Sequence, residues 1–332
     1  MHILKDPNIK LIRYSKELSV DWDRFLANSK NGTFLFNRSY LDYHSDRFVD
    51  HSLLIFDKKE RLMGLFPCST DGNEVVSHGG LTYGGLVLGP RVSTENTLVI
   101  MGMLIDYFSY RGFENMTYKA VPYIYHSKPA QEDLYALFRY GFKLVRRDVS
   151  SAINIKVTPL KGKKLNGYKR AQKEGLSLVE VEESENVLKI VNETLTSKYG
   201  VVAVHDPPEM NLLKSRFPRN IRIFELLLDR ETLGGGILFV DGSVVHAQYI
   251  ATNERAKALR GLDFMVVSFV ALFKESSTWF DFGISTENAG RHLNKPLIRA
   301  KEEFNMSAIC YDTYSLVTMG SSAALSTSLL DG

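Results

Sequence analysis

The sequence contains only two cysteines, and this scarcity excludes several kinds of site. Cys68 and Cys310 each lie in an apolar run typical of a strand, and no CxxC pair occurs. Buried reduced thiols are therefore expected rather than a disulfide framework or a metal site. The sequence also lacks HExxH, GxSxG and clustered carboxylates with metal spacing, so neither a metal centre nor a serine triad is expected.

Long apolar runs and an excess of one charge are missing as well. The start, MHILKDPNIKLIRYS, has no apolar signal-peptide core, and no stretch approaches the roughly 18 uncharged apolar residues of a membrane-spanning helix. We therefore expect a cytoplasmic protein without a membrane span. The 41 Lys and Arg against 38 Asp and Glu leave a formal charge of +3, so any nucleic-acid site must be local.

The sequence does have enough apolar residues for two hydrophobic cores. Of its 332 residues, 44% are hydrophobic and 11% are aromatic, and the length is greater than one ordinary core requires. We expect a first domain at 1–158, a basic helical junction at 159–176, a second domain at 177–318 and a flexible tail at 319–332. The oligomeric state is not predicted.

One order of strands, turns and helix occurs twice in the sequence. Residues 52–78 fit three strands separated by polar turns, and residues 221–250 repeat that order. Each copy continues with a glycine-containing loop, a helix (about 95–110, about 260–275) and a strand (about 114–119, about 278–283). This pattern predicts an α/β (α+β) fold of two tandem domains, each with a mixed, mostly antiparallel sheet flanked by helices.

The region between the copies predicts two helices and a strand. The helices are expected over 133–140 and 165–173, and the strand over 143–155 is expected to close the first sheet. The second helix belongs to KGKKLNGYKRAQKEG, whose cations are Lys161, Lys163, Lys164, Lys169, Arg170 and Lys173. They form either a phosphate-binding surface or a solvated helix face, and both interpretations stay open.

Candidate substrate-binding residues of the first copy lie at strand ends. The stretch SHGGLTYGGLVLGP can bring bare backbone close to a ligand, or it can form a sharply bent strand. It matches neither GxxxxGK[ST] nor GxGxxG. The stretch YKAVPYIYHSKP follows the next strand, where substrate groups often lie. The candidates are His78, Tyr83, Tyr123, Tyr125 and His126; alternatively, the loop packs and caps, with Glu132 in the first turn of the next helix.

A candidate anion site lies in the second copy, in HAQYIATNERAKALRGLDFM. Gly261 is expected at the start of a helix, and Arg255, Lys257 and Arg260 come just before it. The first N–H groups of a helix lack intrahelical partners and suit a pyrophosphate, so these residues are candidates for cofactor binding. The alternative is a helix entry with a charged surface.

The stretch FDFGISTENAGRHLNKPLIRAKEEF places a lysine near the apolar face of a helix. If Asn294 caps this helix, Leu297, Ala300 and Phe304 form its inward stripe, and Lys301 lies beside that stripe. A lysine in this position either extends its ammonium group to water or, in a cleft, neutralises a phosphate or stabilises an oxyanion.

The duplicated unit and this ending resemble the GNAT acyltransferase superfamily. More narrowly, they resemble its double-domain FemAB-like branch and the related GNAT-like proteins associated with bacterial cell-envelope polysaccharide. Asp281, Phe282 and Gly283, followed by Lys301 and Phe304, occupy the pattern DFGG…FKxxFG typical of Fem peptidyltransferases. AKALRG keeps the first glycine of the GNAT pyrophosphate signature, (Q/R)xxGx(G/A), at Gly261. The resemblance implies two tandem GNAT-like domains, with Lys301 at the transfer site.

The resemblance also implies a reaction. It is direct acyl transfer from an activated thioester or ester to an amine or hydroxyl of a cell-envelope sugar or peptide precursor. We expect His246 as general base, Tyr249 as proton donor to the leaving group, and a strand N–H at a bulge as carbonyl ligand. Asp281 joins the substrate-binding candidates. Acyl-CoA (acetyl-CoA) is the expected donor, and aminoacyl-tRNA is the alternative, as in a Fem-type peptidyltransferase; other hypotheses are a non-catalytic ligand-binding GNAT-like protein and an RNA-binding protein.

Overall fold

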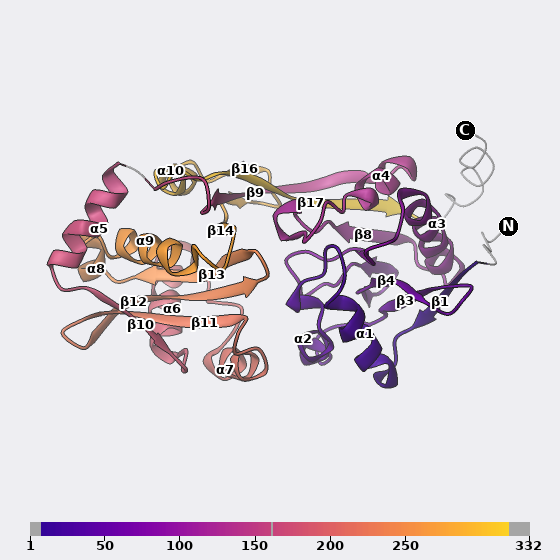
Figure 1. The fold of residues 1–332 in the computed structure, drawn as a ribbon, viewed down its shortest axis with the longest axis horizontal. Helices are drawn as coiled ribbons and strands as arrows, with labels where there is room; N and C mark the ends of the chain where they lie inside the picture. Colours follow the sequence, from indigo (N-terminus) through magenta and orange to yellow (C-terminus); the bar gives the residue numbers. More distant parts are fainter. Residues whose placement is uncertain (1–7, 161, 319–332) are drawn as a thin grey trace. The chain divides into compact units, whose positions relative to one another are not determined.

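The computed structural model describes residues 8–160 and 162–318, and the tail predicted at 319–332 lies outside them. The chain divides into two compact units (Figure 1). Unit 1 takes its described residues from Met1–Asp148, Ala289–Arg291 and Cys310–Gly332, and unit 2 consists of Val149–Asn288 and His292–Ile309. Strands β9 (Lys143–Asn154) and β17 (Ser307–Val317) each have one end in each unit.

Unit 2 is built on a mixed sheet in the order β10-β11-β12-β13-β14-β9. Its other strands are β10 (Ser177–Val181), β11 (Ile221–Leu228), β12 (Glu231–Asp241), β13 (Val244–Thr252) and β14 (Trp279–Ile284). Tight turns join β11 to β12 and β12 to β13, so these strands pair antiparallel. The helical crossover from β13 to β14 makes that pair parallel. The predicted strand order of the second copy is confirmed.

Helices cover both faces of the unit 2 sheet (Figure 1). Gly235 and Gly236 are neighbours on β12, so they face opposite sides of the sheet. A Cβ atom at Gly235 would meet Val187 of α6, whereas one at Gly236 would meet Phe269 of α9. The helices of unit 2 are α5 (Lys163–Lys173), α6 (Glu185–Tyr199), α7 (Pro207–Arg216), α8 (Glu254–Ala258), α9 (Gly261–Phe273) and α10 (Lys295–Glu302), and a two-stranded ribbon consists of β15 (Thr286–Glu287) and β16 (His292–Leu293).

The strands of unit 1 belong to two sheets. One has the order β1-β3-β4-β7, formed by β1 (Ile9–Arg13), β3 (Leu53–Asp57), β4 (Leu62–Phe66) and β7 (Val87–Leu88). The other has the order β17-β8-β6-β5-β2, with β8 (Asn115–Lys119), β6 (Glu74–Val76), β5 (Ser69–Asp71) and β2 (Val49–Asp50). The second of the three strands predicted within 52–78 does not form as one strand, because β4 ends at Phe66 and β5 begins at Ser69. Pro67 has no N–H for a ladder and lies between β4 and β5.

The helices of unit 1 are α1 (Ser19–Leu26), α2 (Arg38–Leu41), α3 (Thr94–Tyr110) and α4 (Glu132–Arg139). Short 3-10 turns occupy Lys16–Leu18, Phe34–Phe36, Asp42–His44 and Tyr123–Tyr125. The long helices α3 and α9 confirm the helix predicted after the third strand of each copy, and α4 and α5 confirm those predicted over 133–140 and 165–173. Boundaries differ by one or two residues.

Strand β9 has a second neighbour that the sequence did not predict. It lies next to β17 in the sheet order, as expected of a strand that closes the first sheet, and its buried C-terminal end also pairs with β14 in unit 2, with Asn154 opposite Trp279 and Ser150 opposite Ile284. An apolar pattern shows that a strand end is buried, but it does not choose the neighbouring strand. The mixed α/β class predicted for the chain is confirmed.

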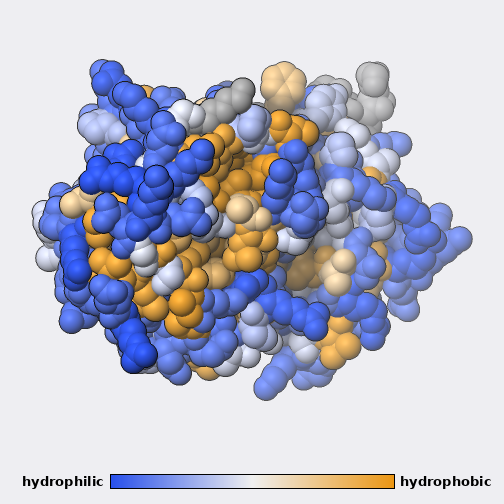
Figure 2. All heavy atoms as spheres, turned by 60° about the vertical axis from the view of Figure 1, so that its left-hand side comes forward, coloured by the Kyte–Doolittle hydropathy of each residue, from blue (hydrophilic) through white to orange (hydrophobic). Residues whose placement is uncertain are grey.

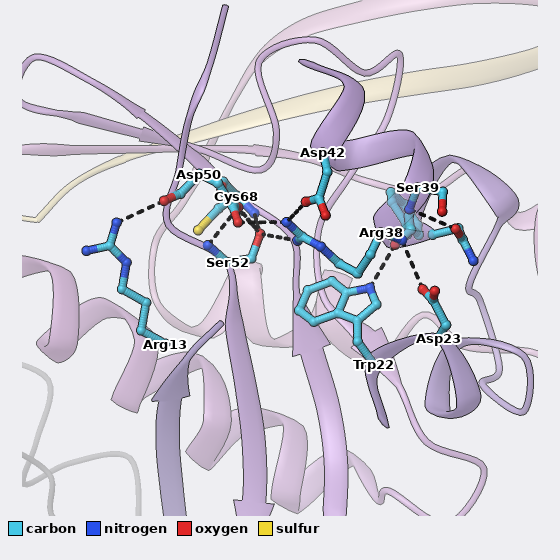
Figure 3. Close-up of polar contacts among 11 residues, drawn as sticks. Arg13, Trp22, Asp23, Arg38, Ser39, Asp42, Asp50, Ser52 and Cys68 are labelled. Atoms are coloured by element: carbon cyan, nitrogen blue, oxygen red, sulfur yellow. Dashed lines mark hydrogen bonds and ion pairs between the residues drawn. The ribbon is translucent and has the colours of Figure 1, made fainter. Parts of the chain in front are cut away.

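A buried arginine ties the first helices of unit 1 to its strands (Figure 3). Arg38 is 3% exposed, and its guanidinium group lies 3.5 Å from the centroid of the Tyr14 ring. Its Nη2 contacts Asp42 and lies 2.8 Å from Asp50 Oδ2, while its backbone N–H donates to Asp23 Oδ1 over 2.9 Å. A guanidinium group satisfied by neighbouring carboxylates and an aromatic ring holds this part of the unit together.

Candidate active site

Strands β13 and β14 run side by side for three residue pairs and then separate. Val244 lies opposite Trp279, and the last pair is His246 with Asp281. Beyond it, β13 continues along β12, whereas Ile284 of β14 pairs with Ser150 of β9. Ligands of open α/β sheets bind where strand directions part in this way, beyond the carboxyl ends of the strands.

The last pair forms a histidine–carboxylate dyad. His246 Nδ1 lies 2.9 Å from Asp281 Oδ2, and Asp281 is fully buried. Ser150 Oγ and the backbone N–H of Gly283 both donate to the other oxygen, Asp281 Oδ1. Because a carboxylate only accepts, the neutral form of His246 carries its proton on Nδ1, and Nε2 is then an acceptor. Within the described residues Nε2 has no hydrogen-bond partner, and the side chain of His246 is 18% exposed.

Lys301 lies beside this dyad and is buried. Only 5% of it is exposed, and its Nζ donates to the carbonyl oxygens of Gly283 over 2.7 Å and Ile284 over 2.8 Å. Burial lowers the pKa of Lys301 to about 8, and the nearby charge of Asp281 opposes that decrease. The ammonium group has a third N–H that these carbonyl groups do not use. Lys301 therefore holds the end of β14 and retains one donor.

The apolar stripe predicted for α10 is partly wrong. Lys301 and Phe304 are buried, but Ala300 is exposed and Leu297 is only half-buried. The inward face of α10 meets backbone carbonyl groups at the end of β14, which require a donor rather than an apolar side chain. Asn294 caps the helix as predicted, because its side chain accepts from the backbone N–H of Leu297.

Gly283 connects the dyad to the lysine. Its φ of 79° lies in the left-handed region that a side chain disfavours, and a Cβ atom there would lie 3.7 Å from His246 Cε1. Its N–H binds Asp281 and its carbonyl oxygen binds Lys301. We call His246, Asp281, Gly283, Lys301 and Ser150 the DFG cluster, all within unit 2.

Tyr249 lies on the same face of the sheet as His246. It pairs with Ile237 and His246 with Phe239, and these two positions share the α6 face with Gly235. Between Ala247 and Tyr249 the ladder shifts by one residue, so Gln248 has no partner on β12, as in a β-bulge. The Tyr249 hydroxyl lies 2.9 Å from His205 Nδ1, and burial raises the pKa of Tyr249.

The predicted anion site at the start of α9 has its own counter-charges. The cations do not gather there: Arg255 pairs with Glu231, Lys257 with Glu254, and Arg260 Nη2 with Asp263 Oδ2 over 2.5 Å. Asp263 is 3% exposed, in the first turn of α9. Gly261 packs closely, because a Cβ atom there would lie 2.7 Å from Leu226 Cδ2. These contacts favour the alternative of a charged helix entry.

Helix α5 covers the same end of α9. Its Lys164 Nζ lies 3.4 Å from Asp263 Oδ1, and its Tyr168 ring stacks on Phe264 with centroids 5.2 Å apart. Gly167 approaches so closely that a Cβ atom would lie 2.1 Å from Asp263 Oδ2. A buried carboxylate and the helix α5 therefore lie close to the helix start where the resemblance implies a pyrophosphate.

The substrate-binding candidates of unit 1 fall into separate places. The rings of Tyr83 and Tyr125 contact each other in a tilted arrangement with centroids 4.7 Å apart, and the Tyr125 hydroxyl lies 3.1 Å from that of Tyr311. His78 is buried beside Phe48, with ring centroids 5.7 Å apart. Tyr123 is 51% exposed, His126 Nε2 lies 3.1 Å from Val121 O, and Glu132 begins α4. Their role in binding a substrate stays a prediction, as do the predicted domain ranges.

Sequence reasoning missed three residues near the DFG cluster. Ser150 reaches Asp281 from β9, His205 reaches Tyr249 from the loop before α7, and Gln248 forms the bulge. The serine and the histidine lie 131 and 44 residues from their partners, so no local pattern indicates them. Within residues 8–160 and 162–318, no group of three or more His, Cys, Asp and Glu is placed to hold a metal, and no helix is long and apolar enough to cross a bilayer.

Comparison with known proteins identifies the fold. No protein-family model matches the sequence, and no curated protein matches it. Among solved structures, FemX superposes with a TM-score of 0.66 and 10% identity, covering 91% of this chain and 96% of FemX. L-PGS from Bacillus licheniformis gives 0.59 and 14%, covering 91% and 92%, and a conserved protein of unknown function from Bacteroides thetaiotaomicron gives 0.55 and 11%, covering 92% and 98%.

Proposed function

Since the chain has the double-domain GNAT-type fold of FemX, we propose that it transfers an acyl or aminoacyl group from an activated ester or thioester to an amine or hydroxyl. We place the reaction at the DFG cluster of unit 2. The observation that carries this proposal is the His246–Asp281 dyad at the point where β13 and β14 separate, with Nε2 left as an acceptor. A base needs both this orientation and access to its substrate.

The dyad supplies the base for a direct transfer. His246 Nε2 takes the proton of the acceptor N–H or O–H, and the acceptor atom forms a bond to the acyl carbon. The bond from that carbon to the leaving oxygen or sulfur then breaks, and the electron pair stays on the leaving group. Asp281 stabilises the imidazolium that forms while itself remaining ionised. No covalent intermediate on the protein is required.

The other residues stabilise charge and protonate the leaving group. We place the carbonyl oxygen of the donor at the N–H of the bulge residue Gln248, where negative charge develops in the transition state. The unused N–H of Lys301 supplies positive potential at the same cluster. Tyr249 keeps its proton at neutral pH because burial raises its pKa, so it can protonate the leaving group.

The start of α9 favours an aminoacyl ester as the donor. Acyl-CoA would require the first N–H groups of α9 for its pyrophosphate, but Asp263 lies there and α5 packs across it. A pyrophosphate bound there would lie at short range from the buried carboxylate of Asp263 and would be repelled by its negative charge. Aminoacyl-tRNA does not depend on that helix end. We therefore rank it above acyl-CoA, which reverses the order expected from the sequence.

The acceptor class rests on the family resemblance. We propose an amine or hydroxyl of a cell-envelope sugar or peptide precursor, encountered in the cytoplasm. Within unit 1, Tyr83 and Tyr125 with Tyr311 remain candidates for binding a substrate. Neighbouring aromatic rings that carry hydroxyl groups suit a hydroxylated or peptidic ligand.

Transfer of a radiolabel tests the proposal. The protein is incubated with aminoacyl-tRNA or with acetyl-CoA, each labelled in the acyl group, and with a pool of cell-envelope precursors, and labelled products are identified by mass spectrometry. The expected result is product from at least one donor, and its loss in His246→Ala. Product formed at the wild-type rate by a folded His246→Ala variant would contradict the assignment, and donor binding without any product would support a non-catalytic binding protein.

A further inference from the structure

Helix α5 carries an unusual charge distribution. Its sequence, KKLNGYKRAQK, contains cations and no acid, and Lys163, Lys169, Arg170 and Lys173 are exposed. In the part of the chain that the structure describes, the side chains of Lys169, Arg170 and Lys173 form no hydrogen bond or ion pair. Helix α6 of the same unit differs, because Glu185 and Glu193 are interspersed with its lysines.

The inner face of α5 is fixed to the rest of unit 2. Lys164 Nζ lies 2.9 Å from Glu303 Oε2 and 4.5 Å from the centroid of the Phe304 ring, and Tyr168 stacks on Phe264. Ala171 is fully buried. The helix is therefore held in place, and its outer cations project from a fixed support.

The cations on the outer face of α5 repel one another. Lys169 and Lys173 are four residues apart and Arg170 and Lys173 are three apart, so these like charges are neighbours on the helix surface. Such like-charge pairs destabilise the helix slightly unless an anion binds between them. The cations extend over a helix about 16 Å long at about 1.5 Å per residue. That length suits several phosphates of one strand rather than a single small anion.

The chemistry of this face favours RNA over a lipid surface. The residues exposed beside the cations are Asn166 and Gln172, so the face presents no apolar side chain that would enter a bilayer. Figure 2 shows that hydrophilic and apolar side chains both lie on the side of the molecule that carries α5 and α8 in Figure 1.

We infer that the outer face of α5, formed by Lys163, Lys169, Arg170 and Lys173, binds the phosphodiester backbone of RNA that carries the acyl donor. The role of the RNA as carrier of the acyl donor rests on the proposed function. The binding of RNA to α5 does not depend on acyl transfer and can be measured without it. Lys164 contacts Glu303 and Phe304, which directly follow the helix that carries Lys301. RNA on α5 is therefore bound to the unit that contains the DFG cluster.

Fluorescence anisotropy with labelled, uncharged tRNA tests the inference on the full chain. The test variant is Lys169→Gln/Arg170→Gln/Lys173→Gln. The matched control is Lys189→Gln/Lys198→Gln/Lys274→Gln, which removes the same charge from exposed lysines elsewhere in unit 2. We expect the test variant to bind at least about tenfold more weakly at 0.1 M salt and to decrease the slope of log K against log salt by about 2, while the control stays within about twofold of wild type. Circular dichroism confirms that both are folded.

The outcomes separate this inference from the proposed function. Equal weakening in both variants, or no tRNA binding by the wild type, would overturn the α5 surface, even if acyl transfer were observed. Binding of the wild type to phosphatidylglycerol vesicles, with no binding to tRNA, would overturn it in favour of a lipid surface. Conversely, His246→Ala should bind uncharged tRNA as wild type does, so a failure of transfer alone leaves the α5 surface intact.

Discussion

Each unit contains a parallel pair of strands, but different groups lie where the two pairs end. In unit 2 the β13–β14 pair ends at His246 and Asp281, where an imidazole nitrogen is left as an acceptor. In unit 1 the β6–β8 pair ends at Val76 with Thr117, and the chain's own glycine-rich segment follows. Gly84 donates its N–H to Lys119 O over 2.9 Å, and Leu86 donates to the Tyr118 hydroxyl over 2.8 Å.

A lysine that donates to backbone carbonyl groups is common to both places, half-buried at Lys119 and buried at Lys301. Lys119 Nζ donates to the carbonyl oxygens of His78, Gly79 and Leu81, as Lys301 does to those of Gly283 and Ile284. Burial lowers the pKa of each lysine to about 8. The comparison shows that the lysine supports the backbone where the strands part. The difference between the units lies in what it supports: a packed loop in unit 1 and a histidine–carboxylate dyad in unit 2.

The largest effect should come from removing the dyad. His246→Ala, and Asp281→Asn, should decrease the transfer rate by about 10²–10⁴-fold, because a positioned base contributes that much and the amide would no longer fix the imidazole tautomer. Rates are measured in single-turnover reactions with the labelled donor. The matched change in unit 1 is Tyr118→Phe, which removes a buried hydroxyl bound to Asp133. It should lower stability and leave the rate of the folded protein within about threefold; equal rate losses in both units would break the comparison.

Filling the packed loop should mainly affect stability. In Gly84→Ala the new Cβ atom would lie 1.9 Å from Ser77 O, so the backbone must move, and we expect a loss of about 2–3 kcal/mol in the free energy of unfolding. Urea denaturation measures it. Gly72→Ala is the control: it has a positive φ but no atom within 4 Å, and should cost about 1 kcal/mol. An unchanged free energy of unfolding in Gly84→Ala would show that Gly84 does not pack closely against Ser77.

The shared lysines can be tested by titration. After reductive methylation with ¹³C-formaldehyde, two lysine resonances should titrate near pH 8, about two units below an ordinary lysine, in addition to the resonance of the α-amino group. Lys119→Arg should remove one and Lys301→Arg the other. If both groups titrated with the surface lysines near pH 10.4, the buried environment described for them would be wrong.

Acid sensitivity should arise in unit 1. Burial lowers the pKa of His51 to about 4, against about 6.5 in the unfolded chain, so between these values the unfolded state binds more protons. The free energy of unfolding should therefore decrease as the pH falls from about 6.5 to about 4, by up to about 2 kcal/mol between pH 7 and pH 5. Urea denaturation across this range measures it. His51→Gln should flatten the dependence, and an equally steep dependence in that variant would assign it to other groups.

Much of the fold could be predicted because its signals are local. The repeated strands, turns and helices follow from alternation, from turn residues and from helix periodicity, and β11, α3 and α9 lie where these patterns place them. Pro67 could be recognised in the sequence as a residue that interrupts a strand, but the sequence did not show that the segments on its two sides, β4 and β5, would join different sheets. The partner of β9 was not predictable, because pairing with β14 depends on segments more than a hundred residues apart.

Some residues of the candidate site could be identified from the sequence, whereas the contacts between them could not. Its DFG motif and Lys301 could be identified from resemblance, whereas the contact of His246 with Asp281 depends on the pairing of β13 with β14. The role of Asp263 was missed, because a first-turn acid is common at helix starts and the covering helix α5 comes from far earlier in the chain. Lys301 was expected beside an apolar stripe; its carbonyl partners depend on a backbone conformation at Gly283 that the sequence only permits.

The central assignment is that acyl transfer occurs where β13 and β14 separate. The most direct measurement is a crystal structure of the protein with a non-hydrolysable amide analogue of the aminoacyl-RNA terminus. The account predicts that the analogue's carbonyl oxygen lies within hydrogen-bond distance of the Gln248 N–H, with its acyl carbon about 3–5 Å from His246 Nε2. An analogue bound at full occupancy with its acyl group in unit 1, beside the loop that contains Gly84, would contradict it.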